Sequence, residues 1–226
     1  MTYEATRDRL EHYFDRTASK TWERLTSDAP VSRIRQTVRE GRDRMRAAML
    51  AQLPGDLTGA RVLDAGCGAG QMAEELARRG AQVVATDISP SLLDVARRRI
   101  PEHLHGRIGF VAGDMLDEGL GRFDHVLAMD SLIHYSAHDI GAALARLGRR
   151  TSASVIFTIA PRTPLLSAMW TVGQLFPRSD RSPAIVPHSD RAIRTALDEA
   201  GMAGALTRVG RVARGFYISQ AMEFHP

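Results

Sequence analysis

The stretch Val62-Leu63-Asp64-Ala65-Gly66-Cys67-Gly68-Ala69-Gly70 decides how this chain folds. An apolar run leads into three glycines separated by single residues, and the residues that follow, up to position 79, have helical periodicity. This order is typical of a buried strand, a tight turn and a helix, in which the backbone can approach a nucleotide-like ligand closely. The stretch therefore predicts a ligand-binding loop in an α/β fold.

Asp64 in this stretch and Gln71 directly after it indicate which ligand the loop binds. A dinucleotide fingerprint places its third glycine at position 71, where this chain has Gln71. Asp64 offers a carboxylate to an amine or a hydroxyl, and a carboxylate does not suit a pyrophosphate. The loop is therefore predicted to bind S-adenosylmethionine (SAM) rather than NAD. Asp64 or the adjacent backbone would meet the methionine ammonium, and close approach to the main chain would be allowed by Gly66, Gly68 and Gly70.

Composition describes an ordinary globular protein. The chain has 226 residues, of which 44% are hydrophobic and 25% charged, so we expect one main domain with a full core. The net charge is +4 and Lys20 is the only lysine, but no basic stripe interleaved with aromatic residues indicates a nucleic-acid partner. Cys67 is the only cysteine, which excludes a disulfide within the chain and a metal site built from several thiolates.

Neither the N-terminal residues nor the most apolar segment has the pattern of a membrane signal. The N-terminus lacks the apolar core of a signal peptide, and the apolar stretch 153–176 is interrupted by Pro161-Arg162 and by Pro164. We therefore expect a cytoplasmic protein without a membrane-spanning segment.

From position 60 onward, strand and helix patterns alternate, which predicts a parallel, doubly wound sheet. The expected strands are Arg61–Ala65, Gln82–Asp87, Ile108–Ala112, His125–Met129, Ser154–Ala160, Ala205–Val209 and Phe216–Met222. The expected helices are Gly70–Arg79, Ser89–Arg99, Asp139–Leu147 and Ser189–Ala200. Ser89 is expected to cap its helix, because Pro90 follows it at the first helical position.

Residues 1–53 have helical periodicity and are predicted to form an extension that precedes the main domain of residues 54–226. Apolar residues share a face in two segments, and Pro54-Gly55 ends the second. These positions are Leu10, Tyr13, Phe14, Trp22 and Leu25 in the first segment, and Val31, Ile34, Val38, Met45 and Met49 in the second. Two interpretations remain open at this point: a lid over the ligand, or helices that only pack against the sheet.

Acidic residues stand at the ends of the first four predicted strands, where an open parallel sheet binds its ligands. Asp87 is suited to accept hydrogen bonds from both ribose hydroxyls, and Asp114 to accept one from the adenine amine. Met115 presents a polarizable surface to the adenine ring. The rest of the predicted cofactor site consists of Ile88, Met129 and Asp130.

With these residues in place, the chain resembles the magnesium-protoporphyrin IX O-methyltransferases, a family of class I SAM-dependent methyltransferases. The glycine loop indicates only the superfamily, and six further segments indicate the family. These segments are YFDRTASKTWERL, VREGRDRM, MDSLIHY, FTIAPRTPLL, LFPRSDRS and RGFYIS. The resemblance covers nearly the whole length and implies a Rossmann-like, mostly parallel seven-stranded sheet.

The resemblance also implies an activity and its setting. The expected reaction transfers a methyl group from SAM to one propionate carboxylate of magnesium protoporphyrin IX, giving the monomethyl ester and S-adenosylhomocysteine in (bacterio)chlorophyll synthesis. The porphyrin is expected to arrive from the large subunit of magnesium chelatase, and the protein to contact photosynthetic membranes peripherally. No spacing of metal-ligating side chains in the sequence supports a protein-bound ion.

Candidates for contact with the propionate lie after the fourth strand and in the N-terminal segment. His134 is the predicted catalytic residue, because it follows a strand end and the family relation points to the same position. Arg39 and Arg42 are candidate propionate ligands, with a solvated basic face as the alternative. Family members tend to carry a tyrosine where this chain has Thr26 and a histidine where it has Arg42, so no catalytic phenol is carried over to Thr26.

The apolar segment after the fifth strand is a candidate surface for the porphyrin. Its apolar positions are Leu165, Leu166, Met169, Trp170, Leu175 and Phe176, and Leu166, Met169 and Trp170 are the predicted substrate contacts. Packing in the core and adsorption to a membrane surface explain the same pattern. The sequence does not separate these three interpretations.

Other functions remain open on the residues alone. A class I methyltransferase of another small molecule, such as a quinone precursor or another carboxylate, would have the same cofactor site. A SAM-binding protein without catalysis is a second alternative. An NAD-dependent oxidoreductase conflicts with Gln71.

Overall fold

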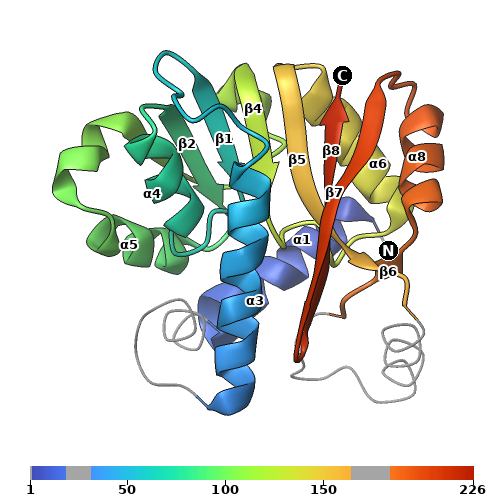
Figure 1. Cartoon of the computed structure of the whole chain (residues 1–226), viewed down its shortest axis with the longest axis horizontal. Helices are drawn as coiled ribbons and strands as arrows, with labels where there is room; N and C mark the ends of the chain where they lie inside the picture. Colours follow the sequence, from blue (N-terminus) through green and yellow to red (C-terminus); the bar gives the residue numbers. More distant parts are fainter. Residues whose placement is uncertain (1, 19–31, 164–183) are drawn as a thin grey trace.

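The computed structural model describes residues 2–18, 32–163 and 184–226. Its centre is a twisted sheet with helices on both faces (Figure 1). The strands are β1 (Arg61–Ala65), β2 (Gln82–Asp87), β3 (Ile108–Ala112), β4 (Phe123–Ala128), β5 (Thr151–Pro161), β6 (Pro187–His188), β7 (Ala205–Arg214) and β8 (Tyr217–His225). The predicted α/β class is confirmed.

The order of strands across the sheet is β3-β2-β1-β4-β5-β8-β7, and the short β6 pairs with β5. Strands β1 to β5 run parallel, whereas β8 pairs antiparallel with both β5 and β7. The order reverses between β1 and β4, and such a switch point opens a crevice at the carboxyl ends of the strands. The sheet is therefore mostly parallel and seven-stranded along its main path, as expected.

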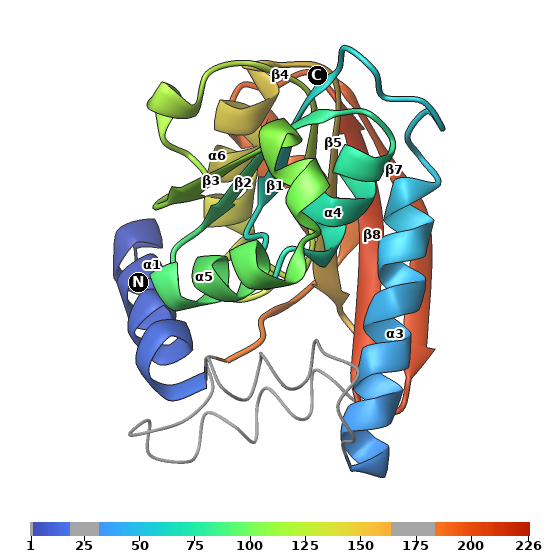
Figure 2. The same cartoon turned by 90° about the vertical axis from the view of Figure 1, so that its left-hand side faces the viewer.

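The helices divide between the two faces of the sheet. They are α1 (Tyr3–His12), α3 (Arg33–Leu50), α4 (Gln71–Arg78), α5 (Pro90–Arg99), α6 (Ala137–Gly148) and α8 (Asp190–Glu199), with shorter turns η1 (Tyr13–Ala18), η2 (Glu102–Arg107) and η3 (Glu118–Leu120). Buried side chains of α3, α4 and α5 form one apolar core, and those of α1, α6 and α8 form the other. Figure 2 shows α1 and α3 on opposite sides of the sheet. Both faces are thus covered, as a parallel sheet requires.

Local sequence explains where several helices begin. The Ser89 hydroxyl accepts a hydrogen bond from the amide of Leu92 and caps α5, with proline at the first helical position. Ser136 and Ser189 cap α6 and α8 in the same way. The predicted cap at Ser89 is confirmed.

The two N-terminal helices lie in different surroundings. Leu10 of α1 is buried in the core that contains α6, whereas Met45 and Met49 of α3 are buried in the core on the other face. Helix α3 runs along the β7–β8 hairpin (Figure 2). Of the predicted apolar positions, Trp22, Leu25 and Val31 lie outside the described residues. Part of the N-terminal extension therefore packs against the sheet.

Candidate active site

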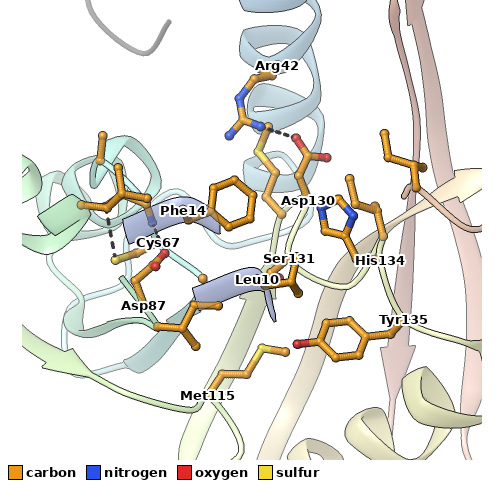
Figure 3. A pocket seen from close by; sticks show the side chains of 18 of the residues that line it. Leu10, Phe14, Arg42, Cys67, Asp87, Met115, Asp130, Ser131, His134 and Tyr135 are labelled. Carbon is orange, nitrogen blue, oxygen red and sulfur yellow. Dashed lines mark hydrogen bonds and ion pairs between the residues drawn. The ribbon is translucent and has the colours of Figure 1, made fainter. Parts of the chain in front are cut away.

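A cavity of about 410 Å³ opens at the carboxyl ends of the parallel strands (Figure 3). The loops after β1, β2, β3 and β4 contribute to its lining, together with α1, η1, α3 and the start of β8. Its volume falls in the range of small-molecule sites, ~300–1,000 Å³. The sheet thus brings parts of the chain that are distant in sequence together around one cavity.

The glycine loop between β1 and α4 forms part of this lining. Gly66 and Gly68 have φ angles of 80° and 54°, and both line the cavity. A Cβ at Gly66 would lie 2.6 Å from the Cβ of Ser131, so no larger residue fits there. Gly70 is not among the lining residues; it precedes α4, and a Cβ there would lie 2.9 Å from the Cβ of Ala96. Gly70 therefore lets the loop pack closely against α5.

Asp87 ends β2 and faces the cavity with a carboxylate held by the backbone. Its Oδ2 accepts a hydrogen bond from the amide of Gly68 at 2.8 Å, and its Oδ1 accepts one from the amide of Ser89 at 2.8 Å. Burial raises the pKa of Asp87 above its usual value, although both amides oppose the shift. Each oxygen retains a lone pair, which suits two ribose hydroxyls. Ile88 lies next to it in the lining.

Two buried oxygens near Gly66 lack a hydrogen-bond partner among the described residues: Oδ2 of Asp64 and Oγ of Ser131. Ser131 lines the cavity, whereas Asp64 lies within β1 and is not a lining residue. Burial, followed by the charge of Asp87, raises the pKa of Asp64 to about 7. Unpaired buried polar atoms are costly. Oγ of Ser131 can therefore be reached by a polar group of a ligand in the cavity, whereas Asp64 is not among the residues that line it.

Asp114, which follows β3, is bound by side chains of α1. Its Oδ1 accepts a hydrogen bond from the hydroxyl of Tyr3 at 2.9 Å, and its Oδ2 pairs with Arg7 at 3.1 Å. The ring of Tyr3 stacks on that of Tyr135 with 4.8 Å between centroids. Met115, next in the chain, is buried and lines the cavity. Helix α1 therefore borders the end of the cavity where an adenine is predicted.

Asp130, just beyond β4, collects hydrogen bonds from several parts of the chain. It is the only non-glycine residue with positive φ among the described residues, at 57°. Its carboxylate pairs with Arg42 of α3 at 2.5 Å (Figure 3). It also accepts a hydrogen bond from the hydroxyl of Tyr217 at 3.1 Å. Thr158 and Ser219 donate to the same carboxylate. The network ties α3, β5 and β8 to the cavity.

His134 follows Asp130 in the loop after β4 and is half-buried in the lining. Its Nδ1 lies 3.2 Å from the carbonyl oxygen of Ala184, and its ring lies 6.3 Å from that of Phe14. Because a carbonyl only accepts, Nδ1 carries the proton and Nε2 is left as the second ring nitrogen. Burial lowers the pKa of His134 below its usual value, so the side chain is neutral near pH 7.

The structure brings most of the predicted site residues to one cavity. The lining includes Arg42, Gly66, Gly68, Asp87, Ile88, Asp114, Met115, Met129, Asp130 and His134. It does not include Asp64, Gly70 or Arg39. The predicted substrate contacts Leu166, Met169 and Trp170, and also Thr26, lie outside the described residues. The contacts of each residue with a ligand remain predictions.

Several lining residues were not predicted as site residues. Tyr3 and Ser131 reach the cavity through tertiary packing, and no spacing in the sequence points to them. Phe216 and Tyr217 belong to the RGFYIS segment, in which no site residue was predicted. The only signal for this pair was the segment's part in the family resemblance.

Within the described ranges, no group of three or more histidine, cysteine or acidic side chains could hold a metal ion. None of the helices in the same ranges is both long and apolar enough to span a bilayer.

Family models match two parts of the chain. A model described as magnesium-protoporphyrin IX methyltransferase C-terminus matches residues 128–226, and one described as methyltransferase domain matches residues 62–153. The second range contains the glycine loop and β1 to β4, and the first contains His134 and the β7–β8 hairpin.

Similar proteins and structures agree with these models. The chain is 57% identical to a magnesium-protoporphyrin O-methyltransferase of Rhodobacter capsulatus, over 99% of this chain and 98% of the relative. It is 30% identical to the enzyme of the same name from Synechocystis, over 95% and 94% of the two chains. A crystal structure of the Synechocystis magnesium protoporphyrin IX methyltransferase with bound S-adenosylhomocysteine matches with a TM-score of 0.80 and 29% identity, covering 96% of this chain and 98% of that one. The chain therefore belongs to the magnesium-protoporphyrin O-methyltransferase family of class I SAM-dependent methyltransferases.

Proposed function

We propose that this protein transfers the methyl group of SAM to a propionate carboxylate of magnesium protoporphyrin IX, forming the monomethyl ester and S-adenosylhomocysteine. Family membership supports the reaction. The observation that carries the proposal is a single cavity lined by the glycine loop and Asp87 together with His134 and Arg42. One ligand-binding space thus contains both a nucleoside site and groups suited to a carboxylate.

The residues that would hold the cofactor differ in chemistry. The two oxygens of Asp87 would accept hydrogen bonds from the ribose hydroxyls, and Asp114 would accept one from the adenine amine. Gly66 and Gly68 would leave room for the ligand beside the main chain. The unpaired Oγ of Ser131 would bind the amino-acid part of the cofactor.

The propionate that accepts the methyl group needs to be positioned more than it needs a general base. A propionic acid titrates near ~4 to 5, by analogy with glutamate, so it is already ionised at neutral pH. When bound, SAM supplies a methyl group on a positively charged sulfur. An oxygen of the propionate forms the new bond to the methyl carbon, and the electrons of the broken carbon–sulfur bond remain on sulfur. Alignment of the two reacting groups, with water excluded, can lower the barrier by roughly 7–11 kcal/mol.

His134 is the residue that we assign to orient the propionate. Its Nδ1 donates a hydrogen bond to the carbonyl oxygen of Ala184, so only Nε2 can form a hydrogen bond with the substrate. A neutral ring has no proton on Nε2 in this tautomer, and an incoming carboxylate would raise the pKa of the ring and favour protonation there. The resulting N–H donates a hydrogen bond to the propionate. Arg42 lines the same cavity, but the carboxylate of Asp130 balances its charge at 2.5 Å, so His134 is the main group assigned to the propionate.

Replacing His134 by alanine tests this assignment. We expect His134→Ala to lower kcat by about 10²-fold or more, the lower part of the range for lost catalytic groups, and to leave the Kd for SAM within about twofold. His138→Ala is the matched control, because His138 lies on α6 with 82% of its side chain exposed. Steady-state production of S-adenosylhomocysteine gives kcat, and calorimetry gives the Kd. Turnover of His134→Ala within about twofold of the unaltered protein would contradict the role.

The substrate itself is tested by a range of acceptors. Purified protein is incubated with labelled SAM and with magnesium protoporphyrin, the metal-free porphyrin, the zinc porphyrin and a quinone precursor. The proposal predicts a labelled porphyrin ester. Methylation of the quinone precursor alone would assign another small-molecule substrate, and SAM binding without any labelled product would favour a non-catalytic protein.

We also propose a cellular setting. The family resemblance supports delivery of the porphyrin by the large subunit of magnesium chelatase and peripheral contact with photosynthetic membranes. The basic balance of the chain, +4, is compatible with an anionic membrane surface. Co-sedimentation of the protein with the chelatase subunit and, separately, with anionic vesicles tests the two contacts.

A further inference from the structure

The turn between β7 and β8 exposes an aromatic side chain to solvent beside the cavity. Phe216 is 69% exposed, the highest value among the large hydrophobic side chains of the described residues, and it also lines the cavity. An exposed aromatic ring contributes little favourable free energy to folding, because its surface is not removed from water. Because Phe216 also lines the cavity, its apolar surface is available to a bound ligand.

The backbone on both sides of Phe216 is fixed. A Cβ at Gly215, whose φ is 58°, would lie 2.3 Å from Oγ1 of Thr37, so the turn fits closely against α3. Arg214 forms an ion pair with Glu40 of α3 at 2.9 Å. On the other side, Tyr217 is buried and donates to Asp130. These contacts hold the turn that carries the Phe216 ring in place. Less conformational entropy is therefore lost when a ligand binds to the ring.

A second exposed apolar side chain lines the same cavity. Ile185 is 43% exposed, and the amide of its neighbour Val186 donates to the carbonyl of Ile133 at 2.8 Å. This hydrogen bond attaches Ile185 to the loop that carries His134. We call Phe216 and Ile185 together the apolar rim.

The size of the cavity places a broad substrate at this rim. A volume of about 410 Å³ has to take the cofactor and the reacting carboxylate. A tetrapyrrole is broad, flat and mostly apolar, and its propionates project from one edge. When one propionate reaches His134, the macrocycle would extend toward the exposed part of the cavity lining, where Phe216 and Ile185 offer apolar surface.

We propose that the apolar rim binds the tetrapyrrole macrocycle, with the ring of Phe216 stacked on its face and Ile185 in contact with it. This inference rests on the proposed function and assigns the residues that select a macrocyclic carboxylate over a small one. Stacking suits two flat apolar systems, and the offset arrangement is the favoured one.

The test compares Phe216→Ser with Ile34→Ser, a matched control. Ile34 is 57% exposed on α3 but does not line the cavity. We expect Phe216→Ser to raise the Kd for magnesium protoporphyrin, measured by porphyrin fluorescence, and its KM by about tenfold, with the KM for SAM within twofold. Ile185→Ser should act in the same direction, Phe216→Trp should restore binding, and Ile34→Ser should behave like the unaltered protein.

The inference would be overturned by an unchanged porphyrin Kd in Phe216→Ser or by an equal loss of porphyrin binding in Ile34→Ser. Loss of binding to anionic vesicles by Phe216→Ser, with porphyrin affinity retained, would also overturn it and assign the rim to a bilayer. Failure of the proposed function looks different, because the unaltered protein would then form no porphyrin ester. Porphyrin binding that depends on Phe216 would still support the rim in that case.

Discussion

Asp64 combines burial with the nearby negative charge of Asp87, and both raise its pKa, to about 7. The folded protein then binds this proton more tightly than the unfolded chain, whose carboxyl titrates near 3.8. Stability contributed by the protonated carboxyl is therefore lost as pH rises from about 4 to about 7, and it stays lost above pH 7.

The variant Asp64→Asn removes this titration. Without cofactor, we expect the Tm of the unaltered protein to fall between pH 5 and pH 8 relative to that of Asp64→Asn, measured by calorimetry in matched buffers. Parallel Tm curves for the two proteins would show that Asp64 does not titrate in this range. Asp56→Asn is a suitable control, because hydrogen bonds from Thr58 lower the pKa of that exposed carboxyl.

The same variant separates two roles of Asp64. If the ionised carboxylate meets the methionine ammonium, SAM affinity should rise with pH through about 7 in the unaltered protein and not in Asp64→Asn. A pH-independent affinity in both proteins would restrict Asp64 to a structural role.

At this scale, sequence spacing predicted the placement of Gly66, Gly68 and Asp87, whereas Ser131 was out of reach because it meets the loop only through folding.

Helix α1 is attached to the domain through Asp114, the residue predicted to bind adenine. In Tyr3→Phe the hydroxyl that donates to Asp114 is lost, while the stack on Tyr135 is retained. We expect faster amide exchange in residues 3–12 and a modest loss of SAM affinity, about two- to tenfold, since one hydrogen bond contributes about 1 kcal/mol. Hydrogen-exchange mass spectrometry and calorimetry measure the two effects.

Glu4→Gln is the control for this variant, because Glu4 is exposed on the same helix. Equal exchange rates in Tyr3→Phe and Glu4→Gln would contradict the role of the Tyr3 hydroxyl. The outcome also bears on the two interpretations of the N-terminal segment. Faster exchange with weaker SAM binding supports a lid, and faster exchange with unchanged binding supports packing alone.

Helix α3 packs against β8 at a glycine. A Cβ at Gly41 would lie 2.6 Å from Cδ1 of Tyr217, so a methyl group has no room there. Alanine normally stabilises a helix by about 1 kcal/mol relative to glycine, but overpacking costs roughly 1–3 kcal/mol. We expect Gly41→Ala to lower the Tm by several degrees and to disturb the contact between Tyr217 and Asp130.

Gly55→Ala provides the comparison for Gly41→Ala, since no atom lies within 4 Å of the added Cβ. We expect it to leave the Tm unchanged or slightly raised. A Tm for Gly41→Ala at or above that of Gly55→Ala would contradict close packing of α3 on the hairpin.

Sequence patterns predicted the elements better than their ends. The bounds of β1, β2 and β3 agree with the prediction, because Asp87 and the glycines mark sharp ends. The hairpin strands were predicted too short, since β7 reaches Arg214 and β8 reaches His225. Backbone pairing between the two strands continues beyond the residues with an apolar pattern, so the local pattern marked only part of each strand.

For the whole molecule, the two ends of the cavity differ in how far the sequence could predict them. The cofactor end is built by the loops after consecutive parallel strands, so strand order alone predicts it. The other end joins α3, the His134 loop and the β7–β8 hairpin, which are distant in the chain. Asp130 and Arg42 were each predicted as site residues, but the network that joins them to Tyr217 depends on tertiary contacts and was not predicted.

Strand β8 comes after β7 in the chain but lies between β5 and β7 in the sheet. During synthesis, residues 155–159 of β5 therefore lack their β8 partners until residues 217–225 have left the ribosome, and unpaired strand edges invite association with other chains. The nucleoside-binding half can assemble from residues already made, whereas Asp130 acquires Tyr217 and Ser219 only at this late stage. A nascent chain would therefore acquire a place for the methyl donor before its acceptor side is complete.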